Sequence, residues 1–155
     1  LTGANNKIRL NFNHPVKVLY WTVEGDRAPD PVGAPDVFET GRVASAFEKV
    51  KLQLNGHDRF SERPSKYFTH LVPYTVHTNV PADYDIYMYS FAINPEAHQP
   101  SGTCNFSRID NATLNLASST AYNTDAGSDG TIYLYALNYN ILRIVSGMGG
   151  LAYSN

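Results

Sequence analysis

The chain has 155 residues, of which 43% are hydrophobic and 17% are charged, and its formal net charge is -2. This length suits a single domain with a sizeable core, and the charged fraction lies below the roughly 25% that is usual for globular domains. The absence of a Lys/Arg block argues against direct binding to nucleic acid. The single cysteine, Cys104, excludes an internal disulfide. No run approaches the roughly 18 apolar residues that a membrane span needs.

The first third of the chain alternates apolar and polar residues in the manner of strands. Residues 7–13 predict a half-exposed strand, and residues 16–23 (VKVLYWTV) predict a more central one because they are apolar on both faces. Residues 25–41 carry three prolines without periodicity, which indicates a long surface loop. Alternation resumes at residues 46–54 and ends at Asn55-Gly56, a dipeptide typical of a tight hairpin turn.

The middle of the chain is broken by prolines, so long helices are excluded there. We expect at most one helical turn, at residues 65–70, within a mixed segment. Residues 85–93 (DIYMYSFAI) predict a second strongly buried strand, and residues 105–116 predict a patterned strand. The Ser/Thr/Asn/Asp/Gly composition of residues 117–130 indicates a loop.

The most apolar stretch is residues 131–145, TIYLYALNYNILRIV. Aromatic and β-branched residues dominate both of its faces, which predicts one long central strand buried on both sides. The glycine-rich residues 146–155 are expected to form a pliable C-terminal tail that does not continue the sheet. About six strands with long connections predict one all-β sandwich over residues 1–155, with Greek-key or jelly-roll wiring.

Catalytic, cofactor and metal motifs are not found in the sequence. The histidines show no pairing at i, i+2 or i, i+4, so a metal ligand set is not predicted. No nucleophile elbow, phosphate loop or dinucleotide fingerprint occurs, and the spacing of the carboxylates singles out no catalytic pair. We therefore predict a protein that is not an enzyme, with no catalytic residue, no cofactor and no metal.

Two asparagines are candidate modification sites. Asn105 (Asn-Phe-Ser) and Asn111 (Asn-Ala-Thr) both fit the N-glycosylation pattern. Because both lie in or beside a strand that other residues mark as packed, we expect them to remain unmodified.

Six aromatic residues offer an alternative function, a stacking platform for sugars in a lectin-like jelly roll. At strand spacing, aromatic residues more often belong to the core, so we favour core for this set. The six residues are Tyr20, Trp21, Tyr67, Phe68, Tyr84 and Tyr89.

Four blocks of the sequence are similar to the major capsid proteins of nucleocytoplasmic large DNA viruses, of the chlorella virus and iridovirus type. They are LNFNHPVKVLYW (residues 10–21), LQLNGHDRFSERPSKYF (52–68), NPEAHQPSGTCNFSRIDNATL (94–114) and YALNYNILRIVSGMGGLAYSN (135–155). They stand in the family's order and cover most of the chain. By this analogy the stretches NHPVK and NFSRID determine the fold rather than bind a ligand.

The resemblance implies a structural role in a virion. Family members carry two jelly rolls in tandem, and the similarity places this chain in the second, without the first jelly roll and without the opening strands of the second. It implies a homotrimer with a pseudo-hexagonal outline that packs with neighbouring capsomers and minor capsid proteins in an icosahedral shell, assembled in the host cytoplasm. We expect a segment with open sheet edges to be unstable alone and to belong to a larger chain or assembly. A carbohydrate-binding jelly roll remains the alternative.

Overall fold

The computed structural model describes residues 5–25, 47–80, 86–118 and 130–153. The loop predictions at residues 25–41 and 117–130 therefore fall almost entirely outside the described residues. The elements of the described chain, in order, are β1 (Asn5–Arg9), β2 (Pro15–Gly25), β3 (Phe47–Leu54), β4 (His57–Asp58), β5 (Arg63–Pro64), the π-helical turn η1 (Tyr67–Leu71), α1 (Val72–Val76), β6 (Tyr87–Ser90), β7 (Cys104–Asn105), the 3-10 turn η2 (Phe106–Arg108), β8 (Ala112–Ser118), β9 (Gly130–Asn138), β10 (Leu142–Val145) and β11 (Met148–Leu151).

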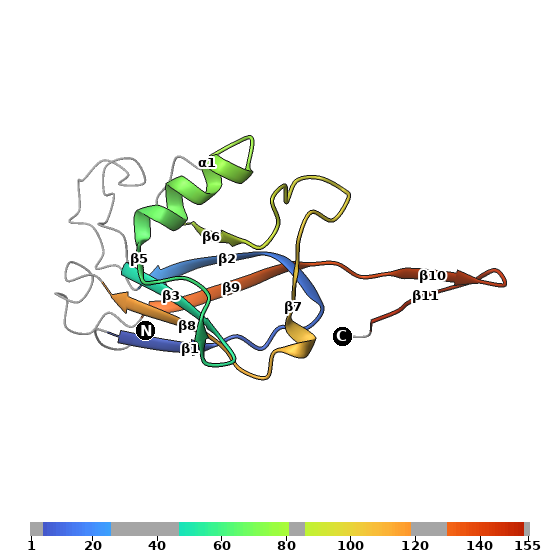
Figure 1. Ribbon diagram of the computed structural model, residues 1–155, viewed down its shortest axis with the longest axis horizontal. Helices are drawn as coiled ribbons and strands as arrows, with labels where there is room; N and C mark the ends of the chain where they lie inside the picture. The colour runs from blue at the N-terminus through green and yellow to red at the C-terminus, as the bar shows by residue number, and fades with distance from the viewer. Residues whose placement is uncertain (1–4, 26–46, 81–85, 119–129, 154–155) are drawn as a thin grey trace, which may run out of the picture.

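Two antiparallel sheets form the body of the molecule (Figure 1). The β8 sheet has the order β1-β8-β3-β4, and β5 also pairs with β3. In the β2 sheet, β9 pairs with β2 from Val16 to Gly25, while β6 and β7 pair with shorter parts of β2. The predicted all-β sandwich is confirmed. Strands distant in sequence, such as β1 and β8, lie side by side, as the predicted crossover wiring requires.

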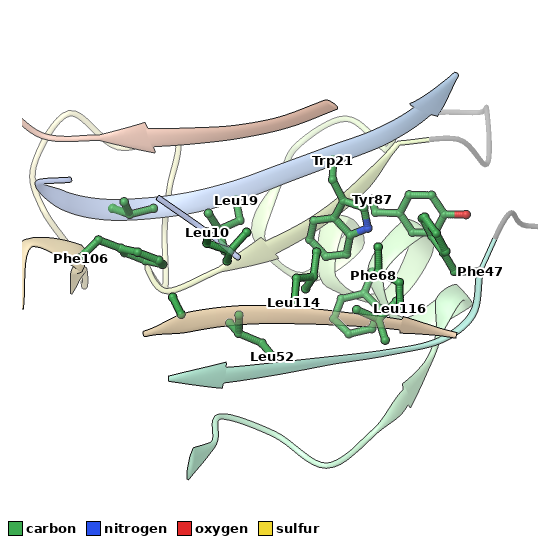
Figure 2. Packing of buried hydrophobic residues seen from close by; sticks show 13 residues of the cluster. Leu10, Leu19, Trp21, Phe47, Leu52, Phe68, Tyr87, Phe106, Leu114 and Leu116 are labelled. Atoms are coloured by element: carbon green, nitrogen blue, oxygen red, sulfur yellow. The ribbon is translucent and has the colours of Figure 1, made fainter. Parts of the chain in front are cut away.

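The core lies between the two sheets and is rich in aromatic rings (Figure 2). The Trp21 indole stacks on Tyr87 with ring centroids 5.8 Å apart, and it meets Phe68 at 5.5 Å. Burial of these large apolar side chains provides the main stabilisation of the sandwich. The buried core residues are Leu10, Val16, Leu19, Trp21, Phe47, Val50, Leu52, Phe68, Tyr87, Phe106, Ala112, Leu114 and Leu116.

The strand that is buried on both faces is β2. Val16, Leu19 and Trp21 belong to the core between the sheets, whereas Val18 packs in a second cluster with Val72 of α1 and with Met88. The pairing of β2 with β9 is irregular between Val16 and Val18. This irregularity lets the even-numbered Val16 share the core side with the odd-numbered Leu19 and Trp21. The helical segment therefore covers one side of β2 and the β8 sheet covers the other, which confirms the prediction of a central strand at residues 16–23.

The prediction of one long, doubly buried strand at residues 131–145 is wrong. The strand β9 ends at Asn138, and β10 begins at Leu142 in a separate hairpin with β11. The core contacts of β9 come from alternate residues, Ile132, Leu134 and Ala136, while its other face is exposed. The physical reason is its position, because β9 pairs only with β2 among the described strands and its outer face carries side chains that are 40–59% exposed.

The glycine-rich tail also differs from its prediction. Met148–Leu151 form β11, which pairs with β10 in register from Leu142↔Leu151 to Val145↔Met148. Ser146 and Gly147 have φ angles of 53° and 80°, which are the positive values that a two-residue hairpin turn requires. The glycine-rich residues therefore form a tight turn and a strand with two glycines, where a pliable tail was expected. As expected for residues 146–155, β11 joins neither sheet of the sandwich, whereas β10 was expected to continue the central strand.

Three further predictions need correction in their extent. The single strand predicted at residues 105–116 is divided into β7, η2 and β8, because Asn105 caps η2 through a hydrogen bond from Ser107 N to its side chain (3.0 Å). The helical turn predicted at residues 65–70 runs through η1 and α1 to Val76. Pro73 lies near the start of α1, just after the junction with the π-helical turn. The buried strand predicted at residues 85–93 is reduced to the four residues of β6.

The predicted hairpin turn at Asn55-Gly56 is confirmed, and it does more than join two strands. Both residues have positive φ, 50° and 82°. The Asn55 side-chain oxygen accepts hydrogen bonds from the backbone N–H groups of Asp110 (3.0 Å) and Asn111 (3.2 Å). The turn therefore also holds the segment that leads into β8.

The two stretches expected to determine the fold contact each other. His14 N donates to Ser107 Oγ (3.0 Å), and Phe106 N donates to His14 O (3.1 Å). His14 has φ of 70°, an unusual value for a residue with a side chain, and it directly precedes the first residue of β2. These contacts fix the start of β2 against the turn before β8.

Replacement of Trp21 should test the core. We expect Trp21→Ala to lower the free energy of unfolding by about 3–5 kcal/mol, because it leaves a cavity between Phe68 and Tyr87. Urea unfolding of the subunit measures this difference. The control is Tyr74→Ala on α1, whose side chain is 77% exposed and should change stability by about 0.5 kcal/mol or less. Equal effects of the two substitutions would contradict the described packing.

Candidate assembly surface

Large apolar side chains are exposed along the outer face of β9. Tyr133, Tyr135 and Leu137 alternate on this face and are 40%, 59% and 45% exposed. The strand carries no charged residue and no proline, which are the usual devices that keep an open strand edge from pairing with other chains. A strand of this kind is a candidate contact surface.

The second part of the surface is the β10–β11 hairpin, which projects beyond the end of the sandwich (Figure 1). All eight of its strand residues are exposed. An isolated two-stranded hairpin is at best marginally stable in water, so an apolar hairpin of this kind is typical of a segment that packs against a partner. Its large apolar residues are Leu142, Ile144, Val145, Met148 and Leu151. We call the outer face of β9 and this hairpin the assembly surface.

The base of the hairpin is held by Asn140. Its side chain accepts hydrogen bonds from Ile141 N (2.8 Å) and Tyr153 N (3.2 Å), and it donates one to Tyr153 O (3.0 Å). The Tyr153 ring lies 5.4 Å from the His14 ring, and Tyr139 N donates to Pro15 O (2.9 Å). The hairpin therefore leaves the sandwich from a defined attachment beside the start of β2.

A polar cluster fixes the connection between β6 and β7. Glu96 Oε1 accepts hydrogen bonds from His77 Nδ1 (2.9 Å), Thr78 N (3.1 Å) and Thr78 Oγ1 (3.2 Å). The other His77 ring nitrogen lies 3.3 Å from Tyr20 Oη of β2. The hydrogen bond with His77, followed by those from Thr78, holds the pKa of Glu96 below its ordinary value. The cluster ties the end of α1 to the β6–β7 connection.

No three potential metal ligands of the His, Cys, Asp or Glu type lie together in the described ranges. In the same part of the chain, no helix has the length and apolar character to cross a membrane.

The two candidate glycosylation sites are both exposed. Asn105 accepts the capping hydrogen bond from Ser107 N, and Asn111 Oδ1 accepts one from Thr113 Oγ1 (3.2 Å). Their position beside the packed strand β8 agrees with the sequence analysis, but their side chains lie at the surface. Whether either carries sugar stays a prediction.

The aromatic residues considered as a sugar platform do not form one. Trp21 and Phe68 are 1% and 0% exposed and lie in the core, and Tyr20, Tyr67 and Tyr89 are only partly exposed. The sixth, Tyr84, lies outside the described residues. The interpretation of these aromatic residues as core is confirmed for Trp21 and Phe68.

Sequence reasoning found residues 131–145 of the assembly surface but assigned them to the interior, and it placed residues 146–155 in a pliable tail outside the sheet. Two signals in the sequence marked the difference. Asn138 and Asn140 interrupt the apolar run where β9 ends, and Ser146-Gly147 marks a hairpin turn.

Acidification should release the Glu96 cluster. The folded state lowers the pKa of Glu96. The ionised Glu96 therefore contributes to folding stability above the ordinary glutamate pKa of about 4.3, and this contribution is lost as the pH falls through the lower pKa of the folded state. The chemical shift of the Thr78 amide proton should follow this titration in NMR spectra. In Glu96→Gln the titration should disappear. A wild-type midpoint above the ordinary glutamate pKa would contradict the assignment.

Comparison with known proteins identifies the family to which this architecture belongs. Residues 1–150 match the family model for the large eukaryotic DNA virus major capsid protein. The chain is 44% identical to the major capsid protein of Pyramimonas orientalis virus and 40% identical to that of Paramecium bursaria Chlorella virus 1, over 99% of this chain and 40% and 44% of those proteins. It superposes on a subunit in a quasi-atomic model of the PBCV-1 virus capsid with a TM-score of 0.75 and 39% identity, over 98% of this chain and 46% of that one.

The chain thus spans less than half the length of the relatives that it matches. These relatives are named as capsid proteins, which are structural components of virions and not enzymes. The match to a solved capsid subunit agrees with the jelly-roll architecture predicted from sequence. The chain belongs to the major capsid proteins of large eukaryotic DNA viruses.

Proposed function

We propose that this chain is part of a capsid subunit that trimerises into pseudo-hexameric capsomers, which tile an icosahedral shell. The observation that carries the proposal is the assembly surface, an apolar strand face and a projecting hairpin on a body with an extensive core. Exposed apolar surface of this kind is typical of protein–protein contact. The match to a subunit of the PBCV-1 virus capsid supports the same interpretation.

We propose further that the chain forms the C-terminal jelly roll of a longer, double jelly-roll polypeptide. The relatives are more than twice as long as the matched region. A jelly roll has eight strands in two sheets, and here the β8 sheet extends on both sides of β8 and β3, whereas the described β2 sheet stops at β9. A further strand from the same polypeptide at the edge of β9 would complete the sheet and would protect its unpaired backbone groups.

The partners follow from this proposal. The subunit would contact two other copies in a trimer, neighbouring capsomers in the shell and minor capsid proteins, with assembly in the host cytoplasm. The low charge of the chain, 17% charged residues with a net charge of -2, suits close packing between identical copies. Direct contact with the genome would require basic surface that this composition lacks.

The mass of the assembled subunit tests the proposal. The subunit, expressed with all polypeptide that is continuous with residues 1–155 in its source, should sediment as a particle of three times its own mass and show a hexagonal outline by electron microscopy. Because the assembly surface is apolar, the trimer should persist at high ionic strength, where screening weakens contacts between exposed charges. A subunit that stays monomeric at all concentrations would contradict the proposal.

A further inference from the structure

The turn between β3 and β4 carries a dipeptide that is able to modify itself. In an Asn-Gly pair the backbone nitrogen of the glycine can attack the side-chain carbonyl carbon of the asparagine, because glycine has no side chain to crowd that nitrogen. Asn55-Gly56 is the only Asn-Gly pair in the sequence, and both residues are exposed. A Cβ atom added at Gly56 would meet nothing within 4 Å, so the space beside it is open.

The reaction at this dipeptide has two steps. The Gly56 nitrogen loses its proton and bonds to Cγ of Asn55, and the side-chain nitrogen leaves as ammonia, which gives a five-membered succinimide ring. Water then opens the ring. If the new bond from nitrogen to Cγ breaks, the product is aspartate. If the original peptide bond breaks, the product is isoaspartate, in which the side-chain carbons have become part of the main chain.

The conformation of the turn opposes closure of this ring. Two residues with positive φ join the paired strands, which is the geometry of a type I′ turn. In the ideal turn the first of them has a ψ angle of about +30°, which directs the following nitrogen away from its Cβ atom. The succinimide ring requires this nitrogen and Cβ on the same side of the Cα–C bond. Asn55 must therefore leave the turn conformation before the Gly56 nitrogen can reach its Cγ.

Three hydrogen bonds to the segment before β8 hold Asn55 in place, and we call them the Asn55 tie. Asn55 N donates to Asn111 O (2.7 Å), and the Asn55 side-chain oxygen accepts from Asp110 N (3.0 Å) and Asn111 N (3.2 Å). The ladder between β3 and β4 has two residue pairs, so it offers little resistance to local opening by itself. The tie therefore restrains both the backbone and the side chain that the reaction must move.

We propose that Asn55 is a site of spontaneous deamidation, which the Asn55 tie keeps intact in the folded subunit. When the tie opens, the reaction proceeds at the rate of an unrestrained Asn-Gly pair multiplied by the fraction of open chains. Isoaspartate lengthens the main chain within the turn, so a two-residue turn can no longer close in the same register. Aspartate keeps an oxygen that accepts the same two N–H groups, so it preserves the tie. Isoaspartate at this position therefore accumulates in subunits whose tie has opened.

Two substitutions at one position separate the tie from the rest of the fold. Asp110→Pro removes the N–H that donates to the Asn55 side chain, and its matched control Asp110→Ala keeps that N–H. The preceding residue, Ile109, is extended with φ of -110° and ψ of 110°, as the residue before a proline must be. The subunit is used with all polypeptide continuous with it. Peptide mass spectrometry follows the conversion of Asn55 in mildly alkaline buffer, and circular dichroism follows folding.

The expected result is that Asp110→Pro converts Asn55 roughly fivefold faster than Asp110→Ala does, which is the scale of one hydrogen bond lost from a local opening. The conversion of Asp110→Ala should match that of the wild type. Equal rates in the two folded variants would overturn the inference, because the tie would then not control the reaction.

The wild type gives a second test, which decides the matter if Asp110→Pro does not fold. Urea at concentrations below the unfolding transition should raise the conversion rate of Asn55 and the hydrogen-exchange rate of the Asp110 amide in parallel, and complete unfolding should raise conversion by roughly tenfold or more. Conversion that is as fast in native buffer as in the unfolded chain would overturn the inference. Conversion that does not follow the exchange of the Asp110 amide would also overturn it.

Discussion

The structure depends on the burial of β2 on both of its faces. Leu19 and Trp21 pack toward the β8 sheet, and Val18 packs beneath α1, so this strand connects the helical cover to the sandwich core. The start of β2 is fixed by His14 against Phe106 and Ser107, and β9 pairs with it to its last residue. Because β9 continues into the hairpin, the position of the assembly surface is set by the strand at the centre of the core.

The sequence was sufficient for the fold class and for several local features. Strand alternation located β2 and β3, whereas the strand predicted at residues 7–13 overlaps β1 only at residues 7–9. The Asn55-Gly56 turn followed from the positive φ angles that this dipeptide accepts. The aromatic residues Trp21 and Phe68 were assigned to the core on their spacing, and they are there. These features are governed by residues close together in sequence, so a local pattern can report them.

What failed depended on contacts between distant segments. Residues 131–145 look buried on both faces because residues such as Tyr135 and Leu137 are apolar, but these two side chains are 59% and 45% exposed. Periodicity reports which residues prefer an apolar environment, and it does not say whether that environment lies within the chain or in a partner. The irregularity in β2, which places Val16 and Leu19 in one core, likewise depends on pairing with β9. The candidate site was therefore recognised as apolar from sequence, but its exposure needed the structure.

The exposed hairpin gives the assembly a thermodynamic link to the order of the subunit. In a free subunit β10 and β11 have only each other and the attachment at Asn140, and a hairpin of this size is marginal in water. A neighbour that binds only the ordered hairpin stabilises that conformation by mass action, so order and assembly rise together with concentration. The glycines of β11 increase the conformational freedom of the unbound strand, so ordering the hairpin has a larger entropic cost. On the proposed function, the order of the hairpin therefore depends on its contacts with a partner, whereas the core of the sandwich is packed within the described residues.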